Sequence, residues 1–386
     1  MPRNSPERLS VAVLLSSGEL FGPFFGGALA RWTYEVYRHL EAQLDVQVFG
    51  FPTATGDRYP LPHQTSAVWQ ACKAMERIPL LRRYEEHLWL RALIGRLRKF
   101  DIIHIHARPQ WVSMLRGLGY RGALMLHLQN DHLGHWTPAM LDELALGVEG
   151  VAVCSTFLLQ TFASRSPALA VKTQVIFNGV NPEMFCPQEK RREGKTIFFV
   201  ARFDSEKGVL ELVRAFECVL QNHPDARLII GGTTGFGTHV ETPYVRNVRH
   251  EASILENTHP GSVQFPGYIH HDKDLPGYFQ RATIFTSPSL FQEPFGLVNV
   301  EAMACATPVV GSSRGGIPEV LGDAGVLVNP EDAQEYAAAL CALLSSSDRR
   351  MQLGKASLQR VQKLFDWRLI AQEWAKYLRA VSRPLG

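Results

Sequence analysis

Two glutamates, Glu293 and Glu301, stand eight positions apart in the segment EPFGLVNVE, shortly after an apolar run that ends in TSPS. The run is typical of a strand, and the residues after the Pro-Phe-Gly turn are typical of a helix that begins near Phe295 or Gly296. In parallel α/β domains ligands bind where strands lead into helices, because helix N-termini present unpaired N–H groups and a partial positive charge. The spacing therefore predicts one acid in a loop over a binding site and a second acid two turns along the helix.

A pair of cations stands at a similar junction earlier in the chain. The apolar run at 196–202 ends at Arg202, and Lys207 follows just before a helical pattern. A guanidinium fork and an ammonium group at a strand-to-helix turn suit a diphosphate, because both charges can reach its oxygens together. Surface ion pairs with Asp204 or Glu206 are the alternative, and the spacing alone does not decide between the two interpretations. Glu293 and Glu301 can share one ligand only if it lies along the first two turns of their helix, and a sugar nucleotide is long enough to do so.

The elements that position these residues come in two series of short apolar runs separated by amphipathic segments. The first series lies at 9–15, 46–51, 101–107, 122–129, 150–155 and 173–179, and a second series of six begins after the polar stretch 181–195. Two such series predict an α/β protein with two doubly wound, Rossmann-like domains that face each other across a cleft. We expect the domains at 1–183 and 184–365, with a C-terminal helix at 366–386 that packs back on the first domain.

The composition argues against several classes of protein, including nucleic-acid-binding, disulfide-rich and membrane-spanning proteins. The 386 residues are 46% hydrophobic and 20% charged, which is typical of a globular chain, and a net charge of +3 is too small to indicate a nucleic-acid partner. The six cysteines are scattered without a C-x-x-C pair, which argues against disulfides and a zinc site and favours a reducing cytoplasm. The sequence contains no apolar run of 18 residues, so no membrane-spanning segment is expected.

Several longer segments carry a family resemblance. ARFDSEKG, GYIHHDKDLPGYFQRATIFTSPS, EPFGLVNVEAMACATPVVGSSRGGIPEVL and VIFNGVNPEMF together resemble glycosyltransferase family 4, whose members are retaining enzymes of GT-B architecture. The likeness extends over nearly all of the second predicted domain and more weakly over the first. DIIHIHARPQW and GGTTGFGTHVETPYVRNV further resemble a bacterial branch with spore-coat and lipopolysaccharide-type transferases.

The resemblance implies roles for the polar residues of the second domain. Arg202 and Lys207 are implied to hold the diphosphate of a nucleotide sugar donor. Glu301 is implied to accept hydrogen bonds from the ribose, and Glu293 to face the transferred sugar. The resemblance also implies that backbone groups surround the donor sugar and the base. These groups belong to Phe295, Gly296 and Leu297 for the sugar, and to Tyr268 and Ile269 for the base.

The first domain carries weaker signals. The family has a glycine-rich loop after its first strand, which SSGELFGPFFGGALARW matches with Gly26 and Gly27 at a helix start. His127, at the end of the fourth predicted strand, matches a histidine that touches the donor sugar in the family. Arg108 and Asp131 are candidate acceptor-binding or loop-ordering residues. The chain departs from the branch where it has Ala107 and Gln129 instead of asparagine and histidine.

The segment HHDKDL contains a D-x-D pair beside two histidines, which in another transferase architecture would bind a metal. Here Asp272 and Asp274 precede a predicted helix and are better explained as acids at its N-terminus. Family 4 enzymes are expected to need no metal and no cofactor, since the nucleotide sugar is a substrate.

The expected reaction is the transfer of a hexosyl group from a nucleotide diphosphate sugar to a hydroxyl of a cell-envelope glycan or glycolipid. UDP is the nucleotide we expect, although no side chain in the pattern identifies the base, the hexose or the acceptor. A sugar-nucleotide 2-epimerase and a non-catalytic sugar-nucleotide-binding protein are the alternatives.

Residues 73–99 hold eight basic and three acidic side chains among leucines, which fits either a domain helix or a peripheral contact with anionic membrane.

Overall fold

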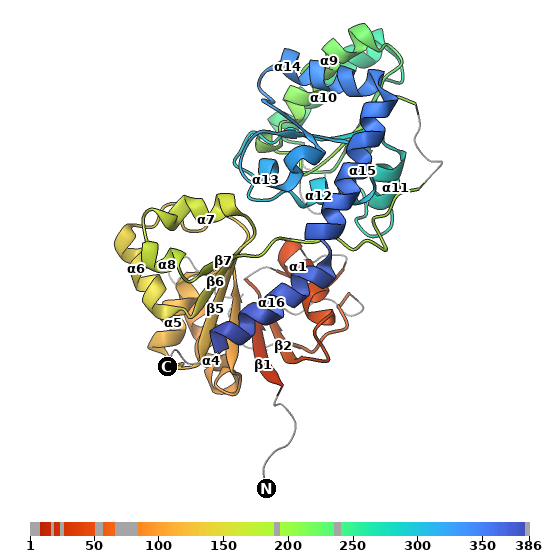
Figure 1. Ribbon diagram of the computed structural model, residues 1–386. Helices are drawn as coiled ribbons and strands as arrows, with labels where there is room; N and C mark the ends of the chain where they lie inside the picture. Colours follow the sequence, from red (N-terminus) through yellow and green to blue (C-terminus); the bar gives the residue numbers. More distant parts are fainter. Residues whose placement is uncertain are drawn as a thin grey trace. The chain divides into compact units, whose positions relative to one another are not determined.

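The computed structural model describes residues 8–16, 19–23, 27–50, 57–65, 84–188, 194–234 and 241–382. The chain divides into two compact units: unit 1 comprises Met1–Phe177 with Trp367–Gly386, and unit 2 comprises Asn178–Asp366 (Figure 1). Within the described ranges, every helix is too short or too polar to cross a membrane.

Unit 1 is built on a seven-stranded parallel sheet in the order β3-β2-β1-β4-β5-β6-β7. Its strands are β1 Leu9–Leu14, β2 Leu44–Gly50, β3 His63–Thr65, β4 Ile102–His106, β5 Ala123–Leu128, β6 Gly150–Val153 and β7 Thr173–Val175. Its helices are α1 Ala28–Arg38, α4 Glu85–Leu97, α5 Gln110–Gly117, α6 Pro138–Gly147, α7 Thr156–Ala163, α8 Pro167–Ala170 and α16 Trp367–Ser382. The short β3 was not predicted, so His127 lies in the fifth strand instead of the fourth.

Unit 2 is built on a six-stranded parallel sheet in the order β10-β9-β8-β11-β12-β13. Its strands are β8 Thr196–Val200, β9 Arg227–Gly231, β10 Val263–Gly267, β11 Ile284–Ser287, β12 Val309–Ser312 and β13 Val326–Val328. Its α-helices are α9 Val209–Asn222, α10 Pro243–Thr258, α11 Leu275–Arg281, α12 Leu297–Ala304, α13 Ile317–Leu321, α14 Ala333–Ser345 and α15 Ser347–Leu364. Figure 1 shows α9, α10 and α14 on one face of the sheet and α11, α12 and α15 on the other. Both sheets have the doubly wound α/β form that the strand series predicts.

The two ends of unit 2 are joined to each other. The Val180 N–H donates to the Phe365 carbonyl over 2.7 Å, and Val180 forms an isolated parallel bridge with Asp366. This pairing holds residues 178–183 to unit 2, and the division therefore falls after Phe177, six residues before the expected boundary. Helix α16 packs beside α1 in unit 1, where the Trp374 indole N–H donates to the Tyr37 hydroxyl over 3.1 Å.

A histidine cluster lies in the core of unit 1 between the sheet and these two helices. His104 and His106 face the same side of β4, His127 lies opposite His106 on β5, and all three side chains are fully buried. Trp32 and Trp374 cover them, with the Trp32 ring centroid 4.3 Å from that of His127. Each histidine therefore sits in an apolar, aromatic environment that disfavours a charged ring.

The hydrogen bonds of the cluster fit neutral rings. Thr33 Oγ1 donates to a carbonyl of its own helix, so the His106 Nε2–H donates to Thr33 over 3.0 Å. Tyr37 accepts from Trp374 and donates to His104 Nδ1 over 2.9 Å. Burial lowers the pKa of His104 and His106 well below the ordinary value, with neighbouring histidines adding to the effect, and burial alone lowers the pKa of His127 to about 3. Protonation of this cluster is thus coupled to unfolding.

Unit 1 should lose stability in acid. The unfolded chain gains protons on these histidines below about pH 6.5, whereas folded His127 stays neutral until the pH approaches 3. The free energy of unfolding should therefore fall as the pH decreases through this window, by about 1.4 kcal/mol per pH unit for each histidine. All seven tryptophans belong to unit 1, so urea unfolding followed by tryptophan fluorescence measures this unit.

The substitution His127→Gln should make the dependence on pH less steep, whereas His135→Gln, at an exposed position, should leave the slope unchanged. A free energy of unfolding that stays constant between about pH 7 and pH 4.5 contradicts this account of the cluster.

Candidate active site

The loop between β11 and α12 is shaped by a glycine. Gly296 is the N-cap of α12 and has a φ of +82°, in the left-handed region that side chains disfavour. A Cβ at this position would lie 2.6 Å from Asn299 Nδ2, and Asn299 is itself fixed because its Oδ1 accepts from Ser287 Oγ over 2.6 Å. The helix begins at Leu297, close to the predicted start, and the EPFG turn can take this form only with glycine at its end.

Two predicted site residues contact each other in unit 2. Lys207 Nζ lies 2.7 Å from Glu293 Oε2 and 4.4 Å from the centroid of the Phe291 ring. Both charged side chains are mostly covered, with 17% and 19% of their surfaces exposed. The pair joins the turn after β8 to the loop after β11, at the carboxyl ends of adjacent strands. The structure thus brings together two of the predicted site residues, an ammonium and a carboxylate.

The turn that carries Lys207 is itself pressed against this loop. Gly208 has a φ of +70°, and a Cβ there would lie 2.0 Å from the Pro288 carbonyl oxygen. The Leu290 N–H donates to the Glu206 carbonyl over 2.8 Å. Arg202, the other predicted phosphate ligand, has a side chain that is 62% exposed and lies 3.4 Å from Asp204, so the surface ion pair named as the alternative is present.

Glu301 is buried on α12, with 5% of the residue exposed. Its Oε1 accepts from His271 Nε2 over 2.7 Å, and its Oε2 is buried without a hydrogen-bond partner among the described residues. His271 was not predicted as a site residue, although the HHD sequence after β10 offered a signal. Of the residues expected to lie near the base, Tyr268 is 44% exposed and Ile269 is buried.

The two aspartates of HHDKDL differ from the expectation in detail. Asp274 occupies the N-cap position of α11 but makes no side-chain capping hydrogen bond. Asp272 Oδ1 lies 2.6 Å from His271 Nδ1, so this acid contacts a histidine, which was not expected. The same histidine contacts Glu301 on α12, a contact between distant segments that helix-start rules do not include.

In unit 1, Gly26 lies outside the described residues, and Gly27 is the N-cap of α1 with an ordinary φ of −85°. Glu19 already occupies this helix N-terminus: its Oε1 accepts from the Ala30 N–H over 3.0 Å, and a Cβ at Gly27 would lie 2.9 Å from that oxygen. Burial raises the pKa of the Glu19 carboxyl, and the backbone hydrogen bonds of Ala30 and Gly27 oppose the rise. The predicted anion site of α1 thus holds an internal carboxylate in this state.

The remaining candidates of unit 1 also have protein contacts. His127 is fully buried, and neither ring nitrogen has a hydrogen-bond partner in the described ranges. Its contact with the donor sugar stays a prediction that would require the ring to become accessible. Arg108 lies 3.4 Å from Glu86, and Asp131 accepts from Thr161 over 3.5 Å.

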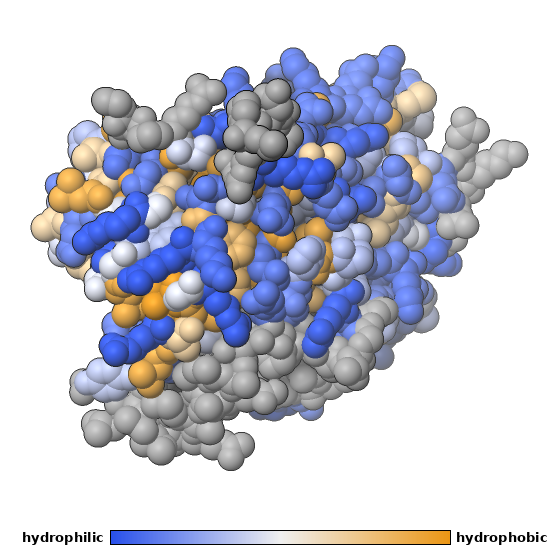
Figure 2. Space-filling view, turned by 90° about the horizontal axis from the view of Figure 1, so that it is seen from below, coloured by the Kyte–Doolittle hydropathy of each residue, from blue (hydrophilic) through white to orange (hydrophobic). Residues whose placement is uncertain are grey.

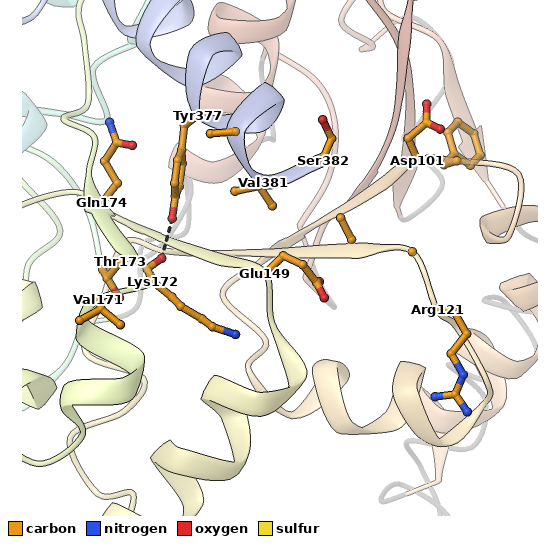
Figure 3. A pocket seen from close by; sticks show the side chains of 14 residues that line it. Asp101, Arg121, Glu149, Val171, Lys172, Thr173, Gln174, Tyr377, Val381 and Ser382 are labelled. Atoms are coloured by element: carbon orange, nitrogen blue, oxygen red, sulfur yellow. Dashed lines mark hydrogen bonds between the residues drawn. The ribbon is translucent and has the colours of Figure 1, made fainter. Parts of the chain in front are cut away.

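A hollow of about 980 Å³ lies elsewhere in unit 1, at the amino ends of β5, β6 and β7 beside the end of α16 (Figure 3). Several of its polar groups are already paired within the protein. The Tyr377 hydroxyl donates to the Lys172 carbonyl over 2.6 Å, the Lys172 ammonium donates to two carbonyls, and Glu149 binds Arg116. Ligands of parallel α/β domains bind at the opposite edge of the sheet, so this hollow is not the candidate site.

Comparison with known proteins identifies the class. Residues 25–184 match the family described as Glycosyltransferase Family 4, and residues 181–360 match Glycosyl transferases group 1. Spore coat protein SA of Bacillus subtilis (strain 168) is 30% identical over 312 residues, covering 75% of this chain and 80% of that protein. Alpha-maltose-1-phosphate synthase of Mycobacterium tuberculosis (strain CDC 1551 / Oshkosh) is 30% identical over 328 residues, covering 76% and 78%.

Solved structures agree on the fold. Anabaena Alr3699/HepE in complex with UDP and glucose has a TM-score of 0.75 at 19% identity, covering 97% of this chain and all of that one. Sucrose-phosphate synthase from Thermosynechococcus elongatus has a TM-score of 0.73 at 22% identity, covering 97% and 99%. The fold and the matches together define a glycosyltransferase enzyme with two Rossmann-like domains of the GT-B class, as predicted. The chain belongs to glycosyltransferase family 4.

The shape of the EPFG loop gives a prediction. Gly296→Ala should destabilise unit 2 and lower transferase activity, because the new Cβ combines a strained φ with a clash against Asn299. Gly261 is a matched control, since it has the same φ of +82° but open space around its Cβ position. Gly261→Ala should cost only the backbone strain, about 1 kcal/mol, and leave activity unchanged. Equal loss of unfolding free energy in the two variants, measured with urea, would contradict a role for the Asn299 contact.

Proposed function

We propose that this chain is a retaining glycosyltransferase that moves a hexosyl group from a UDP-sugar to a hydroxyl of a cell-envelope glycan or glycolipid. The observation that carries the proposal is the Lys207–Glu293 pair beside the N-terminus of α12, with Glu301 farther along the same helix. UDP is supported by the nucleotide in the HepE complexes, and an envelope acceptor by the name of the spore-coat relative.

In this proposal the diphosphate takes over the cation that Glu293 now holds. Lys207 would bind phosphate oxygens, and the exposed guanidinium of Arg202 would turn toward the same group. Departure of UDP develops negative charge on those oxygens, so fixed cations stabilise the transition state more than the bound substrate. Glu293, released from Lys207, would then face the sugar.

Retention of configuration follows from the family account, in which the leaving phosphate accepts the proton of the acceptor hydroxyl on the same face of the sugar. Neither a metal ion nor a cofactor enters the proposed reaction, because the cations of the chain occupy the position where charge develops. A 2-epimerase is disfavoured by the family membership, and it would convert the donor in the absence of any acceptor.

The ion pair provides the test of the donor site. Lys207→Ala should weaken UDP binding by at least about tenfold, or ~1.4 kcal/mol, whereas Glu293→Gln should leave UDP binding equal or tighter, because it removes the competing charge, while lowering kcat. Titration calorimetry and initial rates measure the two effects. Lys195→Ala is a control, since Lys195 makes a 2.7 Å pair with Asp225 on the surface of the same unit.

If Lys207→Ala binds UDP as tightly as the unmodified protein, the donor site is placed wrongly. If Glu293→Gln weakens UDP binding as much as Lys207→Ala does, the two side chains do not compete and the proposed exchange of partners is wrong.

For the acceptor, we propose that unit 1 approaches an anionic membrane through basic side chains, among them those of α4. In α4 the apolar residues Trp89, Leu90 and Leu93 are buried in the core, while Arg91 and Arg96 are exposed. The rest of the basic segment, 73–83, lies outside the described residues. Figure 2 views the molecule from below, toward the amino ends of the unit 1 strands, and shows hydrophilic residues interspersed with small apolar patches.

Electrostatic contact of this kind adds about 1 kcal/mol per basic residue near the surface and weakens with salt. Vesicles with anionic lipid should therefore sediment with the protein at low salt, and Arg91→Glu combined with Arg96→Glu should reduce the bound fraction. Equal binding to neutral vesicles, or no binding at low salt, would contradict the proposal.

A further inference from the structure

His271 lies in the loop between β10 and α11 and joins two carboxylates. Its Nε2 is 2.7 Å from Glu301 Oε1, and its Nδ1 is 2.6 Å from Asp272 Oδ1. The Phe185 ring packs against the imidazole with centroids 5.3 Å apart. The ring is therefore held on three sides by groups of unit 2.

The geometry of these two contacts favours one protonation state of the His271 ring. An ionised carboxylate only accepts hydrogen bonds, so both ring nitrogens of His271 must carry a proton to donate to Asp272 and Glu301 together. The result is a cation between two anions, joined by short charge-assisted hydrogen bonds. Such bonds fix direction as well as charge, and they hold the Glu301 carboxylate in one orientation.

The consequence appears at the other oxygen of Glu301. Oε2 is buried and has no hydrogen-bond partner among the described residues, while the side chain is only 7% exposed. A buried charged oxygen without a donor is costly, so the site favours a ligand that brings hydroxyl donors. The 2′- and 3′-hydroxyls of a ribose are neighbouring donors of this kind.

We propose that His271 is a positioning residue that aims Glu301 Oε2 at the ribose hydroxyls of the donor and so lets the enzyme distinguish ribose from deoxyribose. This role rests on the proposed function, because it requires a nucleotide donor on α12. Loss of the His271 contact would allow the carboxylate to rotate, and the protein would then bind both sugars with similar affinity.

The test compares UDP with 2′,3′-dideoxy-UDP by titration calorimetry. The unmodified protein should bind UDP at least about tenfold more tightly, and His271→Ala should reduce this preference to about twofold. His271→Gln should restore most of the preference, because the glutamine Nε2 can replace the donor to Glu301. A variant that only disturbed folding would lose affinity for both nucleotides alike, and thermal melting of each variant checks the fold.

His270→Ala is the matched control. The His270 ring packs against Tyr268, with centroids 6.0 Å apart, and not against Glu301. This change should leave the preference for UDP over the dideoxy compound intact.

The outcomes separate the two proposals. If Glu301→Ala abolishes the preference and His271→Ala retains it, the positioning role is wrong while the proposed donor site stands. If the unmodified protein binds neither nucleotide, the proposed function is wrong, and the role of His271 fails with it.

Discussion

The Lys207–Glu293 ion pair is the interaction on which the candidate site of unit 2 depends. It connects the turn after β8 with the loop after β11, and these segments approach closely only because Gly208 leaves room for the Pro288 carbonyl. Since the contact is mostly covered, neither charge can be removed without leaving the other partly desolvated. A diphosphate can replace the carboxylate because it supplies the negative charge that Lys207 would otherwise lose. The pair thus joins the two segments, and in the proposed reaction the diphosphate would replace Glu293 on Lys207.

Other residues of unit 2 fix the start of helix α12 and the position of Glu301 on it. Gly296 allows a tight turn at the start of α12. The Ser287 hydroxyl donates a hydrogen bond to Asn299, which fixes this turn. Glu301 lies farther along the same helix. Its Oε1 accepts from His271, and its Oε2 has no hydrogen-bond donor among the described residues. Each acid therefore contacts a basic side chain of its own, Glu293 with Lys207 and Glu301 with His271.

The sequence predicts the parts of this arrangement that depend on local patterns. Strand runs followed by glycine turns place Lys207, Glu293 and Glu301 at strand-to-helix junctions, because parallel strands bring those junctions to one edge of a sheet. The same patterns predict two domains of the correct class. Contacts between distant segments are not contained in such patterns: His271 meets Glu301 across 30 positions, and Glu19 meets the start of α1 across 11. The neutral state of His127 likewise depends on Trp374, which reaches it from the end of the chain.

The central claim is that the diphosphate of a nucleotide sugar replaces Glu293 on Lys207. A crystal structure of the protein with UDP tests this claim most directly. We predict a phosphate oxygen about 2.7–2.9 Å from Lys207 Nζ, with Glu293 Oε2 moved beyond its present 2.7 Å contact. UDP bound elsewhere, with the Lys207–Glu293 pair intact, would contradict the account.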